Sequence, residues 1–341
     1  MTERTYGAGI AGIGWVSTEH IRAYQQHPHC KVVALCSSDR ERAAAKAAEM
    51  GLGDCRIYTS YTEMLADPEV EIVSICSRNN EHPAQAIEAA RAGKHLAIEK
   101  PVATTAADLY AMADEVKRAG VKTVVSFVLR WLPELVTIKN MIDKGVLGNI
   151  FYVESDYWHD IGRWYGGYDW AITKEQCGST MLFGGTHAVD SLRFLIGDIV
   201  EVSAYSTRGH RQDFEYLPTT VSIFKFANGA VGKVCASFEL VSPYIMNFDV
   251  LGSAGTMRDN KLYAPEFFGG QTGYLSVPTV MADSGDVSHH PFAGEIEELM
   301  SSIIAGTEAG ASLAHTLNTH EACLAADISA AEGRPVRLPL R

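Results

Sequence analysis

A glycine-rich segment near the N-terminus offers the first residues whose types and spacing predict a chemical role. The literal match to G-x-G-x-x-G begins at Gly7, but only six residues precede it, too few for the strand that must lead into such a turn. A second register starts at Gly12, continues with Gly14 and Ser17, and follows an apolar run at 6–11. Glycines in that setting let the main chain approach a pyrophosphate, which binds the amides of the following helix N-terminus. We expect a dinucleotide-binding turn at Gly12, and a turn without nucleotide is the alternative on this motif alone.

The residues after the second apolar run, 32–36, should contact the ribose of such a cofactor, about 20 residues beyond the turn. The chain reads Ser37-Ser38-Asp39-Arg40 there. An acidic residue in place of Ser37 would favour NAD, whereas Ser37 and Ser38 with Arg40 nearby suit the 2′-phosphate of NADP. Asp39 could instead turn inward. The segment leaves NAD or NADP open, with a slight preference for NADP.

The segment 151–170 contains eight aromatic side chains among its 20 residues, whereas aromatic residues make up 9% of the whole chain. Rings with polar tips combine flat apolar faces with hydrogen bonding, which suits the C–H faces and hydroxyls of sugars. His159 and Arg163 add polar groups to the segment, and three glycines favour a loop. A pocket loop is the preferred interpretation, and a strand edge or subunit contact is the alternative.

The first part of the chain alternates short apolar runs with Ala-rich stretches of helix formers. Short apolar strands separated by helices are typical of a parallel sheet that is covered on both faces. Residues 1–127 are therefore predicted to form a doubly wound α/β domain. The expected strands cover 6–11, 32–36, 56–58, 72–76, 95–98 and 123–127, and the expected helices cover 15–26, 40–50, 83–92 and 106–119.

The pattern changes after residue 127, where longer runs of alternating apolar and polar residues follow one another without helices between them. Such runs indicate a mainly antiparallel sheet. Residues 128–341 are therefore predicted to form an α+β domain with a large, mainly antiparallel open sheet, which binds substrate and supports oligomerisation. The expected strands cover 150–158, 200–207, 220–226, 230–239 and 246–251, and the expected helices cover 138–144, 292–305 and 313–332.

Composition limits the classes of partner. The length of 341 residues predicts about two domains. The 29 Lys and Arg residues against 41 Asp and Glu residues give a net charge of −12, which disfavours nucleic acid and anionic membranes as partners. The first residues lack the basic head and apolar middle of a secretory signal. The seven cysteines are scattered without metal or redox spacing, so we expect a cytoplasmic protein without a metal site.

Several short motifs follow one another along the chain. The longest is AARAGKHLAIEKP at 89–101, and others are YTEMLADPEV at 61–70, IDKGVLGNI at 142–150, GGTHAVD at 184–190 and SAAEGRPV at 329–336. In order and spacing they resemble the glucose–fructose oxidoreductase/inositol dehydrogenase (Gfo/Idh/MocA) family, whose fifth-strand signature the first motif matches. The resemblance covers most of the chain and implies an N-terminal Rossmann domain, but it indicates no particular substrate.

The resemblance implies roles for individual residues. Lys100 is implied as the catalytic lysine beside the nicotinamide, Glu99 as a residue that helps to hold the cofactor, Pro101 as a residue after a cis bond, and His187 as the acid–base histidine. Hydride transfer from a carbinol carbon must be coupled to removal of the hydroxyl proton, which suits a neutral imidazole, while a lysine stabilises the developing alkoxide. Asp190 either orients the His187 ring or is a first-turn acid favoured by the helix dipole.

Two positions depart from the family pattern, because many relatives have an aspartate in place of Phe183 and a proline in place of Arg78. The first departure affects the catalytic group and the second the loop on the nicotinamide side. The expected cofactor contacts are Gly12, Gly14, Trp15, Val16, Ser37, Ser38, Arg40, Ser77, Asn79, His82, Glu99, Lys100 and Pro101. The expected substrate contacts are Lys100, Arg130, Trp158, His159, Arg163, Trp164, Phe183, Thr186 and His187.

Together these features predict an NAD(P)-dependent oxidoreductase that transfers a hydride between nicotinamide and a hydroxyl or carbonyl carbon of a sugar, cyclitol or related polyhydroxy compound. The resemblance also leaves open an NAD-dependent glycosidase that oxidises its substrate transiently, and a non-catalytic nucleotide-sensing regulator. Lys100 and His187 argue against the regulator, because a sensor needs no proton-transfer pair. The open sheet predicts a homodimer or homotetramer through the second domain.

Overall fold

The computed structural model describes residues 4–282 and 285–341. Residues 1–3 lie outside the described residues. They begin the segment in which the sequence predicts no secretory signal. The chain divides into two compact units, Met1–Val128 with Pro291–Leu317 and Leu129–His290 with Asn318–Arg341. The sequence predicts a single boundary at 127/128, whereas the structure also assigns 291–317 to the first unit, because this stretch packs beside the parallel sheet.

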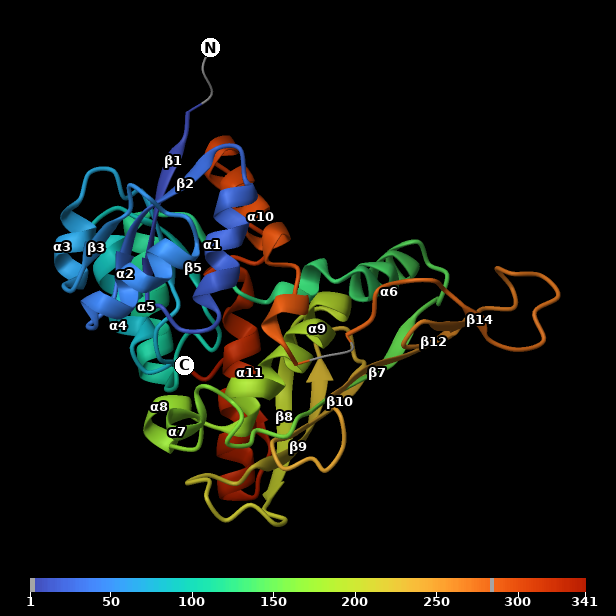
Figure 1. Cartoon of the computed structure of the whole chain (residues 1–341). Coiled ribbons are helices and arrows are strands. Elements are labelled where there is room, and N and C mark those ends of the chain that lie inside the picture. The colour runs from blue at the N-terminus through green and yellow to red at the C-terminus, as the bar shows by residue number, and fades with distance from the viewer. Residues whose placement is uncertain (1–3, 283–284) are drawn as a thin grey trace. The chain divides into compact units, whose positions relative to one another are not determined.

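A six-stranded parallel sheet forms the centre of the first unit. Its strands are β1 (Tyr6–Ala11), β2 (Cys30–Cys36), β3 (Arg56–Tyr58), β4 (Ile72–Ile75), β5 (His95–Ile98) and β6 (Thr123–Val125). Their order is β3-β2-β1-β4-β5-β6, and every neighbouring pair is parallel. Figure 1 draws these strands in blue to blue-green. The direction of the order changes between β1 and β4, and open α/β sheets bind ligands outside the carboxyl ends of the strands at such a point. The predicted doubly wound Rossmann domain is confirmed.

Helices separate these strands. They are α1 (Ser17–Gln26), α2 (Arg40–Glu49), α3 (Tyr61–Ala66), α4 (His82–Arg91), α5 (Ala106–Ala119) and α10 (Phe292–Ala305). The side chains of Asp39, Ser60 and Thr105 accept hydrogen bonds from main-chain amides at the starts of α2, α3 and α5, which fixes where these helices begin. The sequence does not predict α3, because six residues carry too little helical periodicity.

A nine-stranded sheet forms the centre of the second unit. Its strands are β7 (Ile150–Trp158), β8 (Ile199–Thr207), β9 (Thr219–Phe226), β10 (Val231–Ser237), β11 (Ile245–Gly252), β12 (Thr256–Arg258), β13 (Lys261–Tyr263), β14 (Leu275–Ser276) and β15 (Val336–Arg337). Their order is β14-β13-β12-β11-β7-β10-β9-β8-β15. β7 and β10 pair in parallel and the other neighbours pair antiparallel, so the predicted, mainly antiparallel sheet is confirmed.

One face of this sheet is covered and the other is open. Along β9 the side chains of Thr220, Ser222 and Phe224 are buried, whereas those of Val221 and Ile223 are exposed. The helical elements of the unit are η1 (Val128–Trp131), α6 (Pro133–Asp143), α7 (Tyr168–Ala171), α8 (Lys174–Cys177), a π-helical turn η2 (Met181–Gly185), α9 (Thr186–Ile196), η3 (Val287–His289) and, from residue 318 on, α11 (Leu313–Glu332). α9 packs against β7 and β10. In the described part of the chain, no helix has the length and apolar character needed to cross a membrane.

Candidate active site

The glycine-rich turn begins at Gly12, directly after β1. Gly12 has a φ of 85°, and a Cβ atom there would lie 2.6 Å from the carbonyl oxygen of Cys76, so this position requires glycine. A Cβ atom on Gly14 would meet no described atom within 4 Å, which leaves room for a ligand to approach the main chain. Gly7 lies inside β1 and packs against the main-chain carbonyl of Glu69. The register that starts at Gly12 is the one that forms the turn.

The N-terminus of α1 follows this turn. Its first residue, Ser17, is buried, and its hydroxyl donates a hydrogen bond to the carbonyl of Gly14 at 2.6 Å. Trp15 and Val16 form the turn before the helix, which therefore starts two residues later than predicted. Val16 occupies the N-cap position and its side chain makes no capping hydrogen bond. Helix N-terminal amides in this arrangement suit an anionic group such as a pyrophosphate.

Asp39, in the segment after β2, caps the helix that follows. Its carboxylate accepts a hydrogen bond from the main-chain amide of Arg42 at 2.9 Å and so caps α2. The amide of Asp39 in turn donates to Oγ of Ser37 at 3.2 Å. Ser38 and Arg40 are exposed beside it. This capping role accounts for Asp39, and Ser37, Ser38 and Arg40 remain the groups with which this segment can meet a ribose.

His82, at the start of α4, ties together the loops that follow β4 and β5. Its Nδ1 lies 2.8 Å from the carbonyl oxygen of Pro101, and its Nε2 lies 3.1 Å from that of Ser77. Burial lowers the pKa of His82. Oγ of Ser77 donates to the side chain of Gln85 at 2.7 Å, and Asn79 is buried in the same loop. The structure shows these residues bracing the two loops, and their contact with a cofactor stays a prediction.

The loop after β5 carries Glu99, Lys100 and Pro101. The Lys100–Pro101 peptide bond is cis, as the resemblance implies. The carboxylate of Glu99 is buried, with Oε1 3.0 Å from Nε2 of His20 and Oε2 accepting the main-chain N–H of Lys100 at 3.2 Å. Burial raises the pKa of Glu99, but the hydrogen bond to His20 and the nearby positive charges outweigh burial, so the pKa lies below its ordinary value. Glu99 is therefore ionised next to Lys100.

His187 belongs to the second unit, in the first turn of α9 directly after η2. It is buried, and its ring is stacked with that of Tyr157, with centroids 6.2 Å apart and planes 23° apart. A Cβ atom on Gly184 would lie 2.6 Å from ring carbons of Tyr157 and Phe238, so the glycine lets η2 pack directly on these rings. Single π-helical turns are frequent at functional sites. Thr186, predicted to contact substrate, begins α9 and is buried.

Further rings surround His159 just beyond the end of β7. Nδ1 of His159 lies 3.3 Å from the hydroxyl of Tyr157, and the His159 ring lies 5.5 Å from Trp164 and 5.3 Å from Tyr244. On the other side of Tyr157, the ring of His290 lies 6.3 Å from that of His187. The second unit therefore brings His159, Trp164 and His187 into one aromatic group. Tyr244 and His290 join them without any signal in local spacing, because both are far away in the sequence.

Trp158 and Phe183 are two further residues that are predicted to contact substrate. Trp158 alternates with Tyr157 along β7 and lies on the opposite face, where its side chain contacts Cys235. Phe183 belongs to a buried apolar cluster, with ring centroids 5.3 Å from Trp170 and 5.7 Å from Phe238. Strand alternation and core packing account for where these two side chains lie, and their contact with substrate stays a prediction. Arg163, which is also predicted to contact substrate, has an exposed side chain.

Arg130, in η1, pairs with Asp190 on α9. Its Nε and Nη2 donate to the two carboxylate oxygens of Asp190, each at 2.7 Å, and the hydroxyl of Thr319 donates to the same carboxylate at 2.8 Å. Arg130 and Asp190 are both buried. Asp190 therefore holds Arg130 through both of its carboxylate oxygens. The predicted contact of Arg130 with substrate stays untested.

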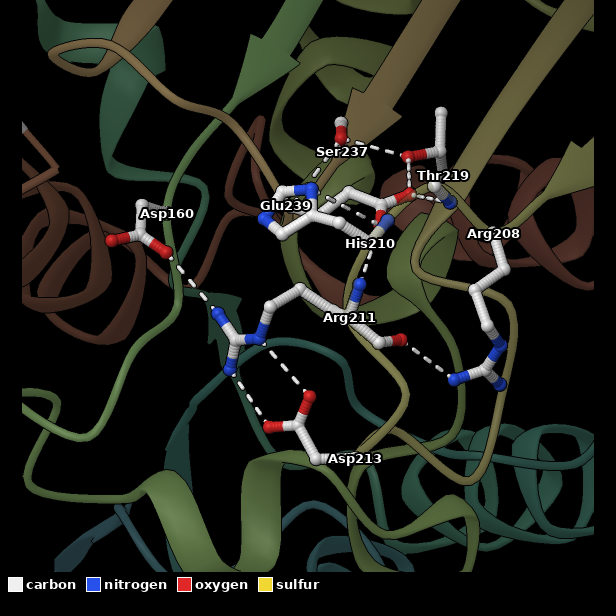
Figure 2. Close-up of polar contacts among 9 residues, drawn as sticks. Asp160, Arg208, His210, Arg211, Asp213, Thr219, Ser237 and Glu239 are labelled. Carbon is white, nitrogen blue, oxygen red and sulfur yellow. Dashed lines mark hydrogen bonds and ion pairs between the residues drawn. The ribbon is translucent and has the colours of Figure 1, made fainter.

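Figure 2 shows a network that anchors the loop 208–213 beside the aromatic segment. Glu239 accepts main-chain hydrogen bonds from Gly209 at 2.8 Å and from His210 at 3.0 Å. Arg211 donates to Asp160 at 3.2 Å, and its guanidinium also pairs with Asp213 at 2.9 and 3.0 Å. Through Asp160, this network holds the middle of the aromatic segment 151–170. In the described ranges, no group of three His, Cys, Asp or Glu side chains is arranged to hold a metal ion.

Family models match both parts of the chain. The oxidoreductase family with an NAD-binding Rossmann fold matches residues 6–127, and the GFO/IDH/MocA C-terminal domain matches residues 135–258. Levoglucosan dehydrogenase of Pseudarthrobacter phenanthrenivorans is 28% identical over 291 residues, which cover 74% of this chain and 73% of that protein. Inositol 2-dehydrogenase of Salmonella typhimurium is 31% identical over 157 residues, which cover 46% of each chain. The match thus spans about half the length of the second relative.

Solved structures share the whole fold. Levoglucosan dehydrogenase in complex with NADH and levoglucosan has a TM-score of 0.88 and 24% identity, with 98% of this chain and 100% of that chain covered. The WlbA dehydrogenase from Bordetella pertussis in complex with NADH and UDP-GlcNAcA has a TM-score of 0.84 and 25% identity, with 99% and 100% covered. From its two matching domains, this chain belongs to the GFO/IDH/MocA family of oxidoreductases, with an NAD-binding Rossmann domain at its N-terminus.

Proposed function

We propose that this protein is a dehydrogenase that transfers a hydride between a nicotinamide cofactor and a hydroxyl or carbonyl carbon of a sugar, cyclitol or related polyhydroxy compound. The observation that carries the proposal lies at the carboxyl edge of the parallel sheet. The Gly12 turn after β1 and the Glu99–Lys100 loop after β5 both flank β4 at that edge. A Cβ atom on Gly14 would meet no described atom within 4 Å, which fits a cofactor that lies against the main chain there.

Lys100 and His187 have separate tasks in this proposal. When bound, the nicotinamide supplies the hydride acceptor or donor. Lys100 stabilises negative charge on the substrate oxygen, as an ammonium can in a site that excludes water. His187 takes the hydroxyl proton during oxidation and returns it during reduction. Neither task needs the aspartate that many relatives have in place of Phe183.

The substrate class is proposed from two lines of support. The relatives are named for levoglucosan and inositol, both of which are polyhydroxy rings. The second unit offers Trp164, 59% exposed, together with the buried His159 and the half-buried Tyr244, so that an apolar ring face lies beside polar tips. Such a combination suits the C–H faces and hydroxyls of a sugar.

For the cofactor we propose NAD, which is the dinucleotide named by the matching family model and by the NADH complexes of two similar structures. The slight preference for NADP has no support from these relatives, but Ser37, Ser38 and Arg40 suit a 2′-phosphate. Titration of protein fluorescence with NADH and NADPH decides between them. If Arg40 meets a 2′-phosphate, Arg40→Ala weakens NADPH binding several-fold and leaves NADH binding unchanged.

The proposal is tested with a panel of sugars, anhydrosugars and inositols, each supplied with NAD or NADP and followed by absorbance of the reduced cofactor. The expected result is net cofactor reduction with at least one polyol. Substrate consumption without net reduction would favour the transient-oxidation glycosidase instead. Tight cofactor binding with no turnover on the panel or on the corresponding ketoses would favour a nucleotide-sensing regulator. Either result overturns the dehydrogenase.

We also propose that the chain forms a homodimer or homotetramer through the open face of the nine-stranded sheet. This face exposes Tyr205 at 80% and Ile223 at 52%, with Val221 between them on paired strands. Apolar side chains on a sheet face are suited to a self-complementary contact with a second copy. Light scattering at micromolar concentration should show two or four chains, and a Tyr205→Glu and Ile223→Glu double variant should be monomeric. A monomeric wild-type protein would contradict the proposal.

A further inference from the structure

A chain of buried polar groups in the first unit lies behind the loop that carries Lys100, and the proposed proton transfer does not use it. The hydroxyl of Tyr24, on α1, lies 2.9 Å from Oγ of Ser74, on β4. The same Oγ lies 3.2 Å from Nδ1 of His20, and Nε2 of His20 lies 3.0 Å from Oε1 of Glu99. The other carboxylate oxygen of Glu99 accepts the main-chain N–H of Lys100 at 3.2 Å. Hydrogen bonds thus run without a break from α1 to the main chain of Lys100.

The surroundings of His20 determine its charge. Glu99 faces it from the end of β5, Cys76 from the end of β4 and Glu295 from α10. Burial lowers the pKa of His20, but Cys76, Glu99 and Glu295 together outweigh burial and raise the pKa well above its ordinary value. The pKa of Glu99 lies below its ordinary value because the hydrogen bond and charge of His20 outweigh its own burial. The two side chains are therefore an imidazolium and a carboxylate, shielded from water.

We propose that His20 is a positioning residue for Lys100, a role that rests on the proposed dehydrogenase function. His20 holds one oxygen of Glu99, and the other oxygen fixes the main chain from which the Lys100 side chain extends. Because His20 lies on α1, the helix that starts at the dinucleotide turn, the same residue links this helix to the lysine loop. Misplacement of a reacting group by about 1 Å can reduce a rate about 100-fold. Loss of His20 should therefore lower kcat, although the His20 side chain is fully buried behind the loop.

The charged pair is tested directly by an NMR titration of the ¹⁵N-histidine-labelled protein without cofactor. His20 is identified by its contact with the ring of Phe292, whose centroid lies 5.3 Å away. The expected result is an imidazole that keeps both protons to a pH well above its ordinary pKa in the wild-type protein and loses one at a lower pH in Glu99→Gln. A neutral His20 at pH 6.5, or an identical titration in Glu99→Gln, would overturn the proposal. This measurement needs no His20 variant to fold.

The effect on Lys100 is tested by the kinetics of His20→Gln. Gln can form a hydrogen bond but carries no charge, so kcat should fall about 10- to 100-fold while the substrate KM changes less than about threefold. His95→Gln is the matched control, because His95 is a half-buried histidine at the opposite end of β5, and it should keep kcat within about twofold of the wild-type value.

A double-mutant cycle separates positioning from a general loss of packing. If His20 and Glu99 act as one unit, the His20→Gln/Glu99→Gln protein should be no slower than the slower single variant. Effects that multiply, or a kcat of His20→Gln within twofold of the wild-type value, would overturn the inference. Absence of turnover in the wild-type protein would instead overturn the dehydrogenase proposal, so the two failures are distinguishable.

Discussion

Lys100 and His187, the two residues with proposed catalytic roles, are held within their own units by opposite means. In the first unit, the loop of Lys100 is held by directional hydrogen bonds between buried charged groups, His20 and Glu99. In the second unit, the turn of His187 is held by shape, with Gly184 pressed against rings and Tyr157 stacked beside the imidazole. Charge fixes the loop of Lys100, and aromatic packing fixes the turn of His187.

This difference has a consequence for variants of each half. A hydrogen-bonded charged pair fixes a main-chain position and depends on protonation, so changes near Lys100 should alter rates together with pH behaviour. Packed rings fix a position by volume and depend little on pH, so changes near His187 should alter KM or stability at every pH. The following experiments test that distinction, from the largest expected effect to the smallest.

Removal of the imidazole itself should have the largest effect in the second unit. His187→Ala should lower kcat about 100- to 1,000-fold, because a positioned acid–base group contributes a factor of this size. Steady-state kinetics on the best substrate of the panel provides the measurement, with the exposed His289→Ala as the matched control. A kcat within about threefold of the wild-type value would remove His187 from the proposed chemistry.

The buried ion pair between Arg130 and Asp190 should contribute to the stability of the second unit rather than to its pH response. Arg130→Leu leaves Asp190 buried without its guanidinium, so the free energy of unfolding should fall by about 3 to 5 kcal/mol. Arg193→Leu is the control, because its partner Asp198 is 61% exposed and its loss should cost less than about 1 kcal/mol. Urea unfolding measures both, and equal losses would contradict the account.

The buried carboxyl group of Glu295, in the first unit, should make the free energy of unfolding depend on pH. Burial raises the pKa of Glu295 to about 7 from an ordinary value of 4.5. The folded state therefore binds this proton more tightly than the unfolded state, and stability is lost as pH rises from about 4.5 through about 7. Glu295→Gln cannot ionise and keeps an acceptor for Ser126, so it should exceed the wild-type stability at pH 8 by up to about 3 kcal/mol and show little gain at pH 4.5.

Urea unfolding at the two pH values measures this effect. Glu297→Gln on the same helix is the control, because the Glu297 carboxylate is 65% exposed and should give no such pH-dependent gain. A gain for Glu295→Gln that is equal at pH 4.5 and pH 8 would show that packing, rather than ionisation, is responsible.

The smallest of these effects is expected at the exposed edge of the aromatic group. Trp164→Ala should raise the substrate KM about fivefold with little change in kcat, since stacking on a sugar face contributes about 1 kcal/mol to binding. Phe151→Ala is the control, because Phe151 belongs to the same aromatic-rich segment but lies at the start of β7, 56% exposed. A lower kcat with unchanged KM would place Trp164 outside the substrate contact.

Much of the fold is predictable from the sequence because its elements have strong local patterns. Continuous apolar runs before helices predict the parallel strands, and α10 and α11 begin and end as predicted. The sequence underestimates α6, which starts at Pro133 rather than 138, because proline in a first turn is a weaker signal than the apolar periodicity that follows. No local sequence pattern predicts that 291–317 belongs to the first unit.

The candidate site is predictable where a motif is local and unpredictable where the contact joins distant segments. The Gly12 turn and the Glu99–Lys100–Pro101 loop follow from motifs of a few residues. The contact of His20 with Glu99 spans 79 residues and has no spacing signal. The face of Trp158 was predictable, since strand alternation separates it from Tyr157 and His159.

The central claim is tested most directly by one comparison, the turnover of Lys100→Met against the wild-type protein, with NADH affinity measured on the same samples. The account predicts a loss of about 1,000-fold or more in turnover, with the NADH dissociation constant within about threefold of the wild-type value, because Met keeps the side-chain length and removes only the ammonium. Turnover within about threefold of the wild-type value, with NADH still bound, would contradict it.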